Sequence, residues 1–360
     1  MIGNTTDQQI IQAHGYCEFI ITKVSRTFAL NIAFLRGDLY RSVLYAYLFC
    51  RIADTIEDTV FVNSKDQQRL LNSYKSIFSL RNFDTLAIES WITDFRNSPK
   101  IAEETSHDVQ LIYHTQMVVL CYLQLPEKHR NAIRECIIEM SDGMSEVLRR
   151  KSAVKQRLYF SKTVDDLNRY CYYVAGTVGI LLTRLFLDSS KAIRQSIELN
   201  LKAHSVSFGL GLQMTNIIKD CWQDYKRGWC YIPQEMMTKN GFEPEDLFLP
   251  QNRENAQKTM NALISRAAQH LDDALSYSLS IPRRLFRIRI FCLLPLFLAI
   301  ATLMEAKDNP GILKGKDVKI SRGKVRQIIK TTLFLSVSNS ALKNYYAHFR
   351  VNLGEMGTQV

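Results

Sequence analysis

The sequence predicts an all-α protein, and three observations support this class. Apolar residues recur at helical spacing along almost the whole chain. Glycine and proline are scarce, with 15 and 8 in 360 residues, where average usage would give roughly 43 together. Gly209 and Gly211 form a GxG that lies inside a helical run and follows no strand. The dinucleotide-binding and phosphate-loop folds are therefore excluded.

The predicted helices follow one another with short connections. They cover residues 7–23, 37–61, 66–80, 84–95, 102–122, 128–151, 163–187, 191–226, 255–280, 284–305 and 322–349. The breaks between them fall at Ser25–Thr27, Pro126, 227–233, 241–251 and Pro310–Gly311. No linker or shift in composition divides the chain. We therefore expect one domain over residues 1–360, with a basic C-terminal extension, 305–360, packed on it.

The formal net charge is +11, and it is concentrated at one end of the chain. Residues 281–360 contain 14 Lys and Arg against 4 Asp and Glu. Such a segment attracts phosphates, anionic lipid or nucleic acid. The aromatic residues lie in apolar helical runs, which disfavours a nucleic-acid binder. A phosphate ligand and an anionic membrane surface therefore stay as the expected partners.

The chain shows no secretory signal at its N-terminus, so we expect a cytoplasmic protein. The longest apolar run, Ile290–Met304, is 15 residues long and contains Pro295. A spanning helix needs about 20 residues. The run is therefore interpreted as a buried core helix, with membrane-surface contact as the alternative. The eight cysteines form no CxxC and are expected to be reduced core residues.

A first group of polar residues lies on the helix predicted over 37–61. Asp54, Glu57 and Asp58 share one helical face, and Tyr47 and Arg51 precede them on it. Three carboxylates on one face repel each other unless a cation joins them, and oxygen ligands of this kind suit Mg²⁺. A solvated acidic helix end is the alternative. The apolar residues leading into the group favour the metal interpretation.

A second polar stripe lies on another largely apolar helix. Gln213, Asn216, Asp220 and Asp224 project to one side of it. Burying such a stripe is unfavourable unless a partner satisfies it, and a hydrogen-bonded core network is one solution. The other solution is a diphosphate held through Mg²⁺ between two facing helices, with no phosphate loop needed.

The segment 167–186 is apolar and helical, with Gly176 and Gly179 inside it. Glycine within a helix costs roughly 1 kcal/mol against alanine. The two glycines therefore indicate close packing or space for a ligand. Tyr170 lies on this helix. It is either a core residue with a satisfied hydroxyl or, beside a metal–diphosphate site, a group that transfers a proton.

Several segments, in order along the chain, resemble the squalene/phytoene synthase family, and within it most closely the members that make squalene. The similarity covers roughly residues 20–330. Its motifs are SRTFAL from Ser25, YLFCRIADTIED from Tyr47, YCYYVAGTVG from Tyr170, LQMTNIIKDCWQD from Leu212, YIPQE from Tyr231, FCLLPLFLAIATL from Phe291 and VKISRGK from Val318.

The resemblance implies an all-α isoprenoid synthase fold around a central apolar cavity. It implies a Mg²⁺-dependent prenyltransferase that joins two farnesyl diphosphates head to head through presqualene diphosphate and reduces the product with NADPH to squalene. It also assigns roles to individual residues. The implied metal ligands are Asp54, Glu57, Asp58, Asn216, Asp220 and Asp224. The implied substrate contacts are Ser25, Arg26, Phe28, Tyr47, Arg51, Val174, Gln213, Asn216, Lys219, Phe291 and Pro295. Tyr170 is the implied proton carrier, and Lys319, Arg322 and Lys324 are the implied NADPH contacts.

Three residues depart from the family pattern. Lys219 and Gln223 stand in the second aspartate motif where the family has Arg and Glu, and Trp229 replaces an Arg before the PQE turn. Lysine keeps the charge but loses the planar fork. Gln223 removes one carboxylate from a metal site, and Trp229 removes an ordinary phosphate contact. The alternatives are a dehydrosqualene or phytoene synthase, or a hydroxysqualene synthase, which use no reductant; the first two tend to lack the C-terminal extension that this chain has. A catalytically silent scaffold protein is disfavoured because Asp54, Asp58, Asp220 and Asp224 are all present.

The basic C-terminal segment bears on location. We expect peripheral association with an anionic membrane surface and no nucleic-acid partner, and a monomer is the favoured state.

Overall fold

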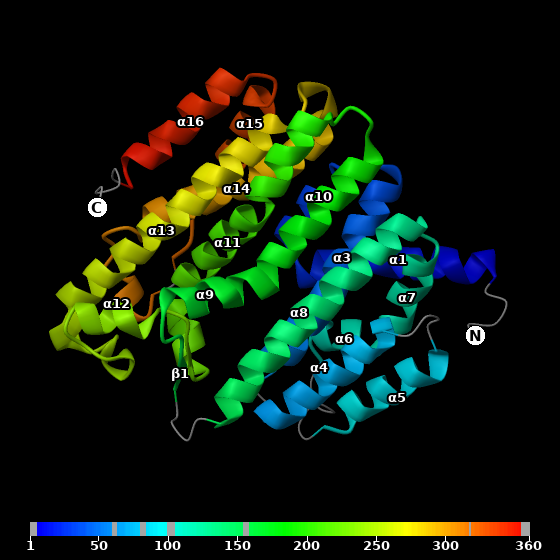
Figure 1. The fold of residues 1–360 in the computed structure, drawn as a ribbon, viewed down its shortest axis with the longest axis horizontal. Helices are drawn as coiled ribbons and strands as arrows, with labels where there is room; N and C mark the ends of the chain where they lie inside the picture. The colour runs from blue at the N-terminus through cyan, green and yellow to red at the C-terminus, as the bar shows by residue number, and fades with distance from the viewer. Residues whose placement is uncertain are drawn as a thin grey trace. The chain divides into compact units, whose positions relative to one another are not determined.

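The computed structural model describes residues 6–59, 63–79, 84–98, 105–153, 158–316 and 318–353. Almost all regular structure in these ranges is helical, so the all-α prediction is confirmed (Figure 1). The chain divides into two compact units. Unit 1 comprises Met1–Lys155 and Ile180–Lys191, and unit 2 comprises Gln156–Gly179 and Ala192–Val360. The expectation of one domain with an extension over 305–360 stays a prediction; residues 317 and 354–360 of that extension lie outside the described residues.

Unit 1 is built around a central helix, α3. Its helices are α1 (Asp7–Val24), α2 (Arg26–Ile32), α3 (Gly37–Asp58), α4 (Ser64–Ser79), α5 (Thr85–Arg96), α6 (His107–Tyr113), α7 (Thr115–Leu123), α8 (Glu127–Ala153) and most of α10 (Thr177–Ser189). α3 is apolar on most of its surface and is buried by its neighbours, with α8 packed against both α3 and α4. This helix carries the first group of predicted site residues.

Local side-chain bonds set the boundaries of the first two helices. Thr6 and Gln9 form a capping box at the start of α1. Ser25 ends that helix and caps the next one, since its hydroxyl accepts a hydrogen bond from the amide of Phe28 in the first turn of α2. The predicted break at Ser25–Thr27 is therefore confirmed, and it consists of a helix cap and not of an open loop.

The helix predicted over 102–122 is wrong at its centre, because it divides into α6 and α7. His114 leaves the helical conformation there, with φ −110° and ψ 22°. The hydroxyl of Thr115 donates to the carbonyl of Ile112, and the ring of His114 bonds the carbonyl of Gln110. Such side-chain hydrogen bonds to carbonyls compete with the backbone hydrogen bonds of the helix, and they interrupt it here.

Unit 2 is a helical layer around α11. Its principal helices are α9 (Val164–Cys171), the π-helix η1 (Tyr172–Gly176), the start of α10, α11 (Gln195–Lys226), α12 (Gln234–Lys239), α13 (Arg253–Ser280), α14 (Phe286–Ala306), α15 (Arg322–Leu335) and α16 (Asn339–Val351). Short 3₁₀ turns occur at Pro244–Asp246, Pro250–Asn252, Arg283–Leu285 and Ile312–Lys314. α11 packs against η1, α13 and α14. β1 (Tyr159–Phe160) and β2 (Trp229–Cys230) form a two-residue parallel pair.

Two predictions for unit 2 need correction. The helix predicted over 322–349 divides into α15 and α16, because Ser338 is extended and its hydroxyl caps the amide of Ala341. The loop predicted over 241–251 contains two 3₁₀ turns, each beginning with a proline. Proline favours the first position of a turn of helix, which the periodicity of apolar residues does not show.

α14 confirms the interpretation of Ile290–Met304 as a buried helix, since most of its side chains are inaccessible. By length and composition, two helical stretches are apolar enough to cross a membrane, Val164–Ser189 and Arg283–Ala306. Of their most apolar windows, 44% and 78% are buried inside the protein, and the core helix of a soluble protein passes the same test. The eight cysteines are free and buried, as expected.

Two glycines, one in the 167–186 segment and one on α11, allow close packing of backbone against backbone. A Cβ at Gly179 would lie 2.0 Å from the carbonyl oxygen of Ser205, and one at Gly209 would lie 2.3 Å from that of Ala175. Real Cβ atoms do not approach backbone this closely. Glycine at these two positions therefore lets α11 pack directly on η1 and the start of α10.

We expect Gly179→Ala to lower the free energy of unfolding by about 1–3 kcal/mol, as overpacking does. Gly15→Ala is the matched control, because α1 leaves open space around Gly15 and alanine favours a helix by roughly 1 kcal/mol. Urea unfolding followed by circular dichroism measures both. Equal stability of the Gly179 variant and the parent would contradict the packing argument.

Candidate functional site

The first carboxylate group lies at the C-terminal end of α3 in unit 1. Asp54 is partly accessible, Asp58 is exposed and Glu57 is buried. Gln67 of α4 fixes this helix end, since its amide nitrogen donates to the carbonyls of Glu57 at 2.6 Å and Thr59 at 2.9 Å. Asp54 and Asp58 are thus held one turn apart on a rigid end, and Glu57 points to a more buried side of the same turn.

Burial raises the pKa of Asp54 to about 7, and the neighbouring charges of Asp58 and Asp108 add to the shift while Arg51 opposes it. A carboxylate whose charge is disfavoured in this way gains from a cation at the same place. Mg²⁺ needs only one or two carboxylates, with water and substrate phosphates as its other ligands. The donor set of Asp54 and Asp58 therefore fits Mg²⁺.

We expect the raised pKa of Asp54 to make the metal-free protein less stable as the pH rises from about 4 to about 7. The folded state then binds a proton that the unfolded state has released, so the free energy of unfolding falls with pH. Asp54→Asn should reduce this dependence of the free energy of unfolding on pH between about 4 and about 7. Asp38→Asn is the control, because Asp38 lies in the first turn of the same helix and is exposed. A pH dependence that survives in the Asp54 variant would contradict the assignment.

Arg51 lies one turn before Asp54 and is oriented by an acidic partner. Its Nε donates to one carboxylate oxygen of Asp108 at 2.8 Å and its Nη2 to the other at 3.1 Å. Burial alone would lower the pKa of Arg51, but the bonds and charge of Asp108 raise it. This bidentate pair fixes a permanent cation beside Asp54. Asp108 was not predicted from the sequence, because it lies 57 residues away from its partner.

Tyr47, Ser25 and Phe28 form a small cluster beside Arg51. The rings of Phe28 and Tyr47 lie 5.1 Å apart between centroids. Burial raises the pKa of the Tyr47 phenol, and a hydrogen bond with Ser25 partly offsets that rise. Arg26 is exposed on the first turn of α2. Unit 1 therefore brings Ser25 and Phe28 beside Tyr47, whose phenol also lies near the charges of Arg51 and Asp54.

The second carboxylate group lies on α11 in unit 2. Gln213 and Asp220 are partly accessible, Asn216 is exposed, and Asp224 is buried. The Lys219 ammonium lies 3.1 Å from a carboxylate oxygen of Asp220. Arg227 donates to Asp224 at 2.6 Å. The predicted stripe therefore has two acids, each already beside a cation from its own helix or helix end.

Tyr170 lies at the end of an aromatic stack in unit 2. Its ring is stacked on that of Tyr231, with 4.4 Å between centroids and 18° between planes. The rings of Trp229 and Tyr231 are also stacked, with 5.6 Å between centroids and 9° between planes. Trp229 stands where the resemblance predicts an arginine, and it is buried, so this chain has a buried aromatic side chain where a charge was expected.

Val174 lies within the π-helix η1, immediately after the helix that carries Tyr170. Single-turn π segments inside α-helices frequently mark functional sites. Phe291 is buried on α14, and Pro295 lies one turn later and removes one bond of that helix. These residues stay predicted contacts of a hydrocarbon chain.

The predicted NADPH contacts lie just before and at the start of α15. Lys319 and Arg322 are exposed. Lys324 is less accessible, and its ammonium lies 2.6 Å from a carboxylate oxygen of Glu305. Lys324 would have to leave Glu305 to bind an anionic group of the cofactor.

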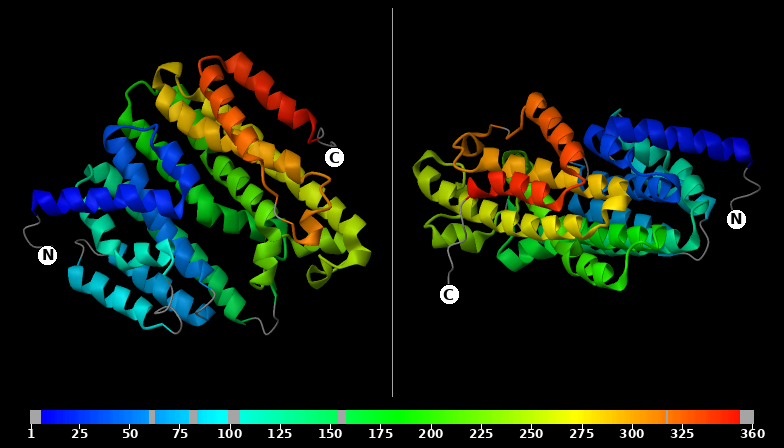
Figure 2. Two further views of the ribbon diagram at one scale, coloured as in Figure 1. Left: turned by 180° about the vertical axis from the view of Figure 1, so that it is seen from behind. Right: turned by 90° about the horizontal axis from the view of Figure 1, so that it is seen from above.

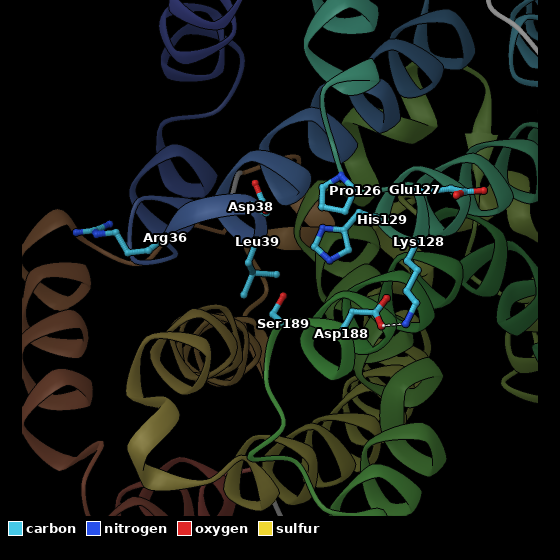
Figure 3. A pocket seen from close by; sticks show the side chains of 9 residues that line it. All are labelled: Arg36, Asp38, Leu39, Pro126, Glu127, Lys128, His129, Asp188 and Ser189. Carbon is cyan, nitrogen blue, oxygen red and sulfur yellow. Dashed lines mark hydrogen bonds and ion pairs between the residues drawn. The ribbon is translucent and has the colours of Figure 1, made fainter.

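Unit 1 also contains a pocket of about 510 Å³ that holds none of the predicted residues (Figure 3). It lies among the starts of α3 and α8 and the end of α10. His129 lines it, with Nδ1 2.7 Å from the hydroxyl oxygen of Ser42, and burial lowers the pKa of this histidine. Across the described ranges, no three His, Cys, Asp or Glu side chains group closely enough to hold a metal by themselves.

The fold and the two carboxylate groups define the class of all-α isoprenoid synthases. A solved structure of TcSQS with a bound ligand matches 98% of this chain and 94% of its own, with a TM-score of 0.78 and 21% identity. A dehydrosqualene synthase structure matches 95% of this chain and 99% of its own, with a TM-score of 0.57 and 21% identity. At such identities the likeness concerns the fold alone.

The squalene/phytoene synthase family model matches residues 21–324, and the chain belongs to this family. Squalene synthase of Schizosaccharomyces pombe is 32% identical over 323 residues, which cover 90% of this chain and 66% of that protein. The rat enzyme is 32% identical over 325 residues, covering 90% and 69%. The chain thus spans about two thirds of the length of these relatives.

Proposed function

We propose that the chain is a squalene synthase, which condenses two farnesyl diphosphates head to head through presqualene diphosphate and reduces the product to squalene. The similarity to curated squalene synthases over 90% of the chain carries this proposal. The arrangement of the two carboxylate groups supports it, since each presents aspartates beside a cation on a helix that is otherwise apolar.

The predicted residues of unit 1 would bind the diphosphate in different ways. Asp54 and Asp58 would hold Mg²⁺, and Arg51 supplies a fixed cation beside them. When bound, Mg²⁺ draws charge from the leaving diphosphate and favours ionisation of the farnesyl group. Ser25, Arg26 and Tyr47 would contact the diphosphate, and Phe28 the prenyl chain. Glu57 is the weakest ligand candidate because it is buried away from Asp58.

In unit 2, Asp220 and Asp224 would hold Mg²⁺. Gln213, Asn216 and Lys219 would contact and orient a diphosphate group bound to that metal. Tyr170 would take the proton lost when the cyclopropane of presqualene diphosphate closes. The stack with Tyr231 and Trp229 orients its ring for that transfer. Val174, Phe291 and Pro295 would contact the hydrocarbon and exclude water from the cation.

NADPH would be recognised through its phosphates by Lys319 and Arg322, with Lys324 recruited from Glu305. When bound, NADPH would supply the hydride that reduces the cation formed from presqualene diphosphate. A cytoplasmic, peripheral position on an anionic membrane and a monomeric state complete the proposal. The basic charge of residues 281–360 supports the membrane contact.

One incubation tests the proposed reaction. Protein, farnesyl diphosphate and Mg²⁺ are combined with and without NADPH, and the extracted hydrocarbons are analysed. We expect squalene only with NADPH, and no product once EDTA removes the metal. Dehydrosqualene or phytoene irrespective of NADPH would assign the chain to a non-reducing branch of the family, and hydroxysqualene would indicate water as the quenching nucleophile.

A further inference from the structure

One corner of unit 2 exposes large apolar side chains. We call it the basic apolar corner and define it by Phe286, Phe334, Val337, Arg283 and Lys330. Phe334 is 81% exposed, Val337 65% and Phe286 46%. Phe334 and Val337 flank the turn between α15 and α16, and Phe286 begins α14. Exposed apolar groups gathered at one place mark an interaction surface.

Hydrogen bonds show that the two segments of the corner lie together. Arg289, one turn after Phe286 on α14, donates through Nε to the carbonyl of Ser336 at 2.9 Å. Ser336 lies between Phe334 and Val337 in the chain. Both views in Figure 2 place the connection between α13 and α14 and the turn between α15 and α16 at the same end of unit 2.

The charge of the corner has one sign. Neither 274–304 nor 318–353, the stretches that form it, contains an Asp or Glu. Arg283 is exposed immediately before Phe286, and Lys330 is exposed one turn before Phe334 on α15. The guanidinium of Arg287 lies over the ring of Phe286, 5.1 Å from its centroid. The apolar tips thus share these two stretches with cations and no acid. Glu198 lies on the start of α11, which meets the end of α13 through the Asn200–Ser280 bond, and it is paired with Lys202 at 2.6 Å.

We propose that the basic apolar corner docks the protein on an anionic lipid bilayer, with Phe334 and Val337 inserted at the level of the acyl chains and the cations on the headgroups. Aromatic and aliphatic tips surrounded by Lys and Arg suit such an interface. A second copy of the chain is the disfavoured occupant, because a symmetric contact would bring like charges together. The inference rests on the proposed membrane association and names the surface responsible for it.

Vesicle sedimentation without substrate tests the proposal. The protein is mixed with phosphatidylcholine vesicles that contain 30% phosphatidylserine, or none, at low and high salt. Phe334→Ser with Val337→Ser should weaken binding to the anionic vesicles at least tenfold, from the loss of apolar burial. Arg283→Gln with Lys330→Gln should weaken it about fivefold for each charge removed.

Matched variants control for general effects of each change. Leu249→Ser with Val351→Ser removes two exposed apolar residues elsewhere in unit 2, and Lys162→Gln with Lys239→Gln removes two exposed charges. Both should bind as the parent does. In a second measurement, brominated lipids should quench the added fluorescence of Phe334→Trp but not that of Leu249→Trp.

The outcomes separate the possible errors. If the parent binds anionic vesicles and the corner variants bind equally well, the surface assignment is wrong while the membrane association stands. If the parent binds no vesicles, both are overturned. A change in oligomeric state of the corner variants, with vesicle binding unchanged, would assign the corner to self-association and overturn the proposal. Squalene production is scored separately and depends on neither result.

Discussion

Asp54→Asn and Asp220→Asn are each expected to lower the turnover of farnesyl diphosphate by about 10³-fold or more. A metal ion contributes several kcal/mol to the stabilisation of charge in a transition state, and loss of one ligand removes much of that contribution. The amide is nearly the same size as the carboxylate, so packing is preserved. Product formation at saturating Mg²⁺ and NADPH measures the effect.

The stability of the Asp54→Asn variant distinguishes a loss of catalysis from a loss of folding. Because burial raises the pKa of Asp54 to about 7, a neutral amide should leave the metal-free protein at least as stable at pH 7. We therefore expect activity to disappear while the midpoint of urea unfolding stays or rises.

Asp38→Asn on α3 and Glu198→Gln on α11 are the matched controls, since both acids are ion-paired at the starts of the same two helices. They should keep normal turnover. Normal turnover in either Asp54→Asn or Asp220→Asn would refute the metal assignment for that helix.

The sequence was sufficient to predict the helices and the residues on each face. The polar stripes on α3 and α11 repeat at three and four positions, so their shared faces followed from helical geometry alone. The same reasoning failed at His114 and Ser338, where side-chain bonds to the backbone end a helix inside an apolar pattern. Such bonds leave no mark on periodicity.

The partners of the site residues were beyond sequence reasoning because they come from distant segments. Asp108 binds Arg51 from another helix, and Tyr231 reaches Tyr170 through the short parallel pair of β1 and β2. Arg227 carried a local signal, since it lies three residues after Asp224.

The net charge of residues 281–360 also needed the structure for its interpretation. Arg289 belongs to that basic segment, yet its side chain is fully buried. It cannot contact a phosphate or a membrane from there. Its neighbours Arg283 and Arg284 are exposed, so the same run of arginines supplies both a surface charge and a structural cation.

The guanidinium of Arg289 joins the ends of three helices through hydrogen bonds to backbone carbonyls and to one side chain. Its Nη1 donates to the carbonyls of Ile281 at 2.9 Å and Leu279 at 3.2 Å, at the end of α13. Its Nε donates to Ser336 after α15, and its Nη2 to the side chain of Asn339 at the start of α16. Burial, aided by the charge of Arg283, lowers the pKa of Arg289. The carbonyl dipoles at the end of α13 are what make this cation tolerable.

We expect Arg289→Met to lower the free energy of unfolding by about 3–5 kcal/mol, because several buried carbonyls lose their donor at once. Arg289→Lys should lower the free energy of unfolding by less, since lysine keeps the charge, although it lacks the planar fork. Urea unfolding measures both, and Arg326→Met on the exposed face of α15 is the control. Hydrogen exchange should show the loss of protection first in α15 and α16, which Arg289 attaches to the end of α13. A loss of protection spread evenly over unit 2, or none, would contradict this role.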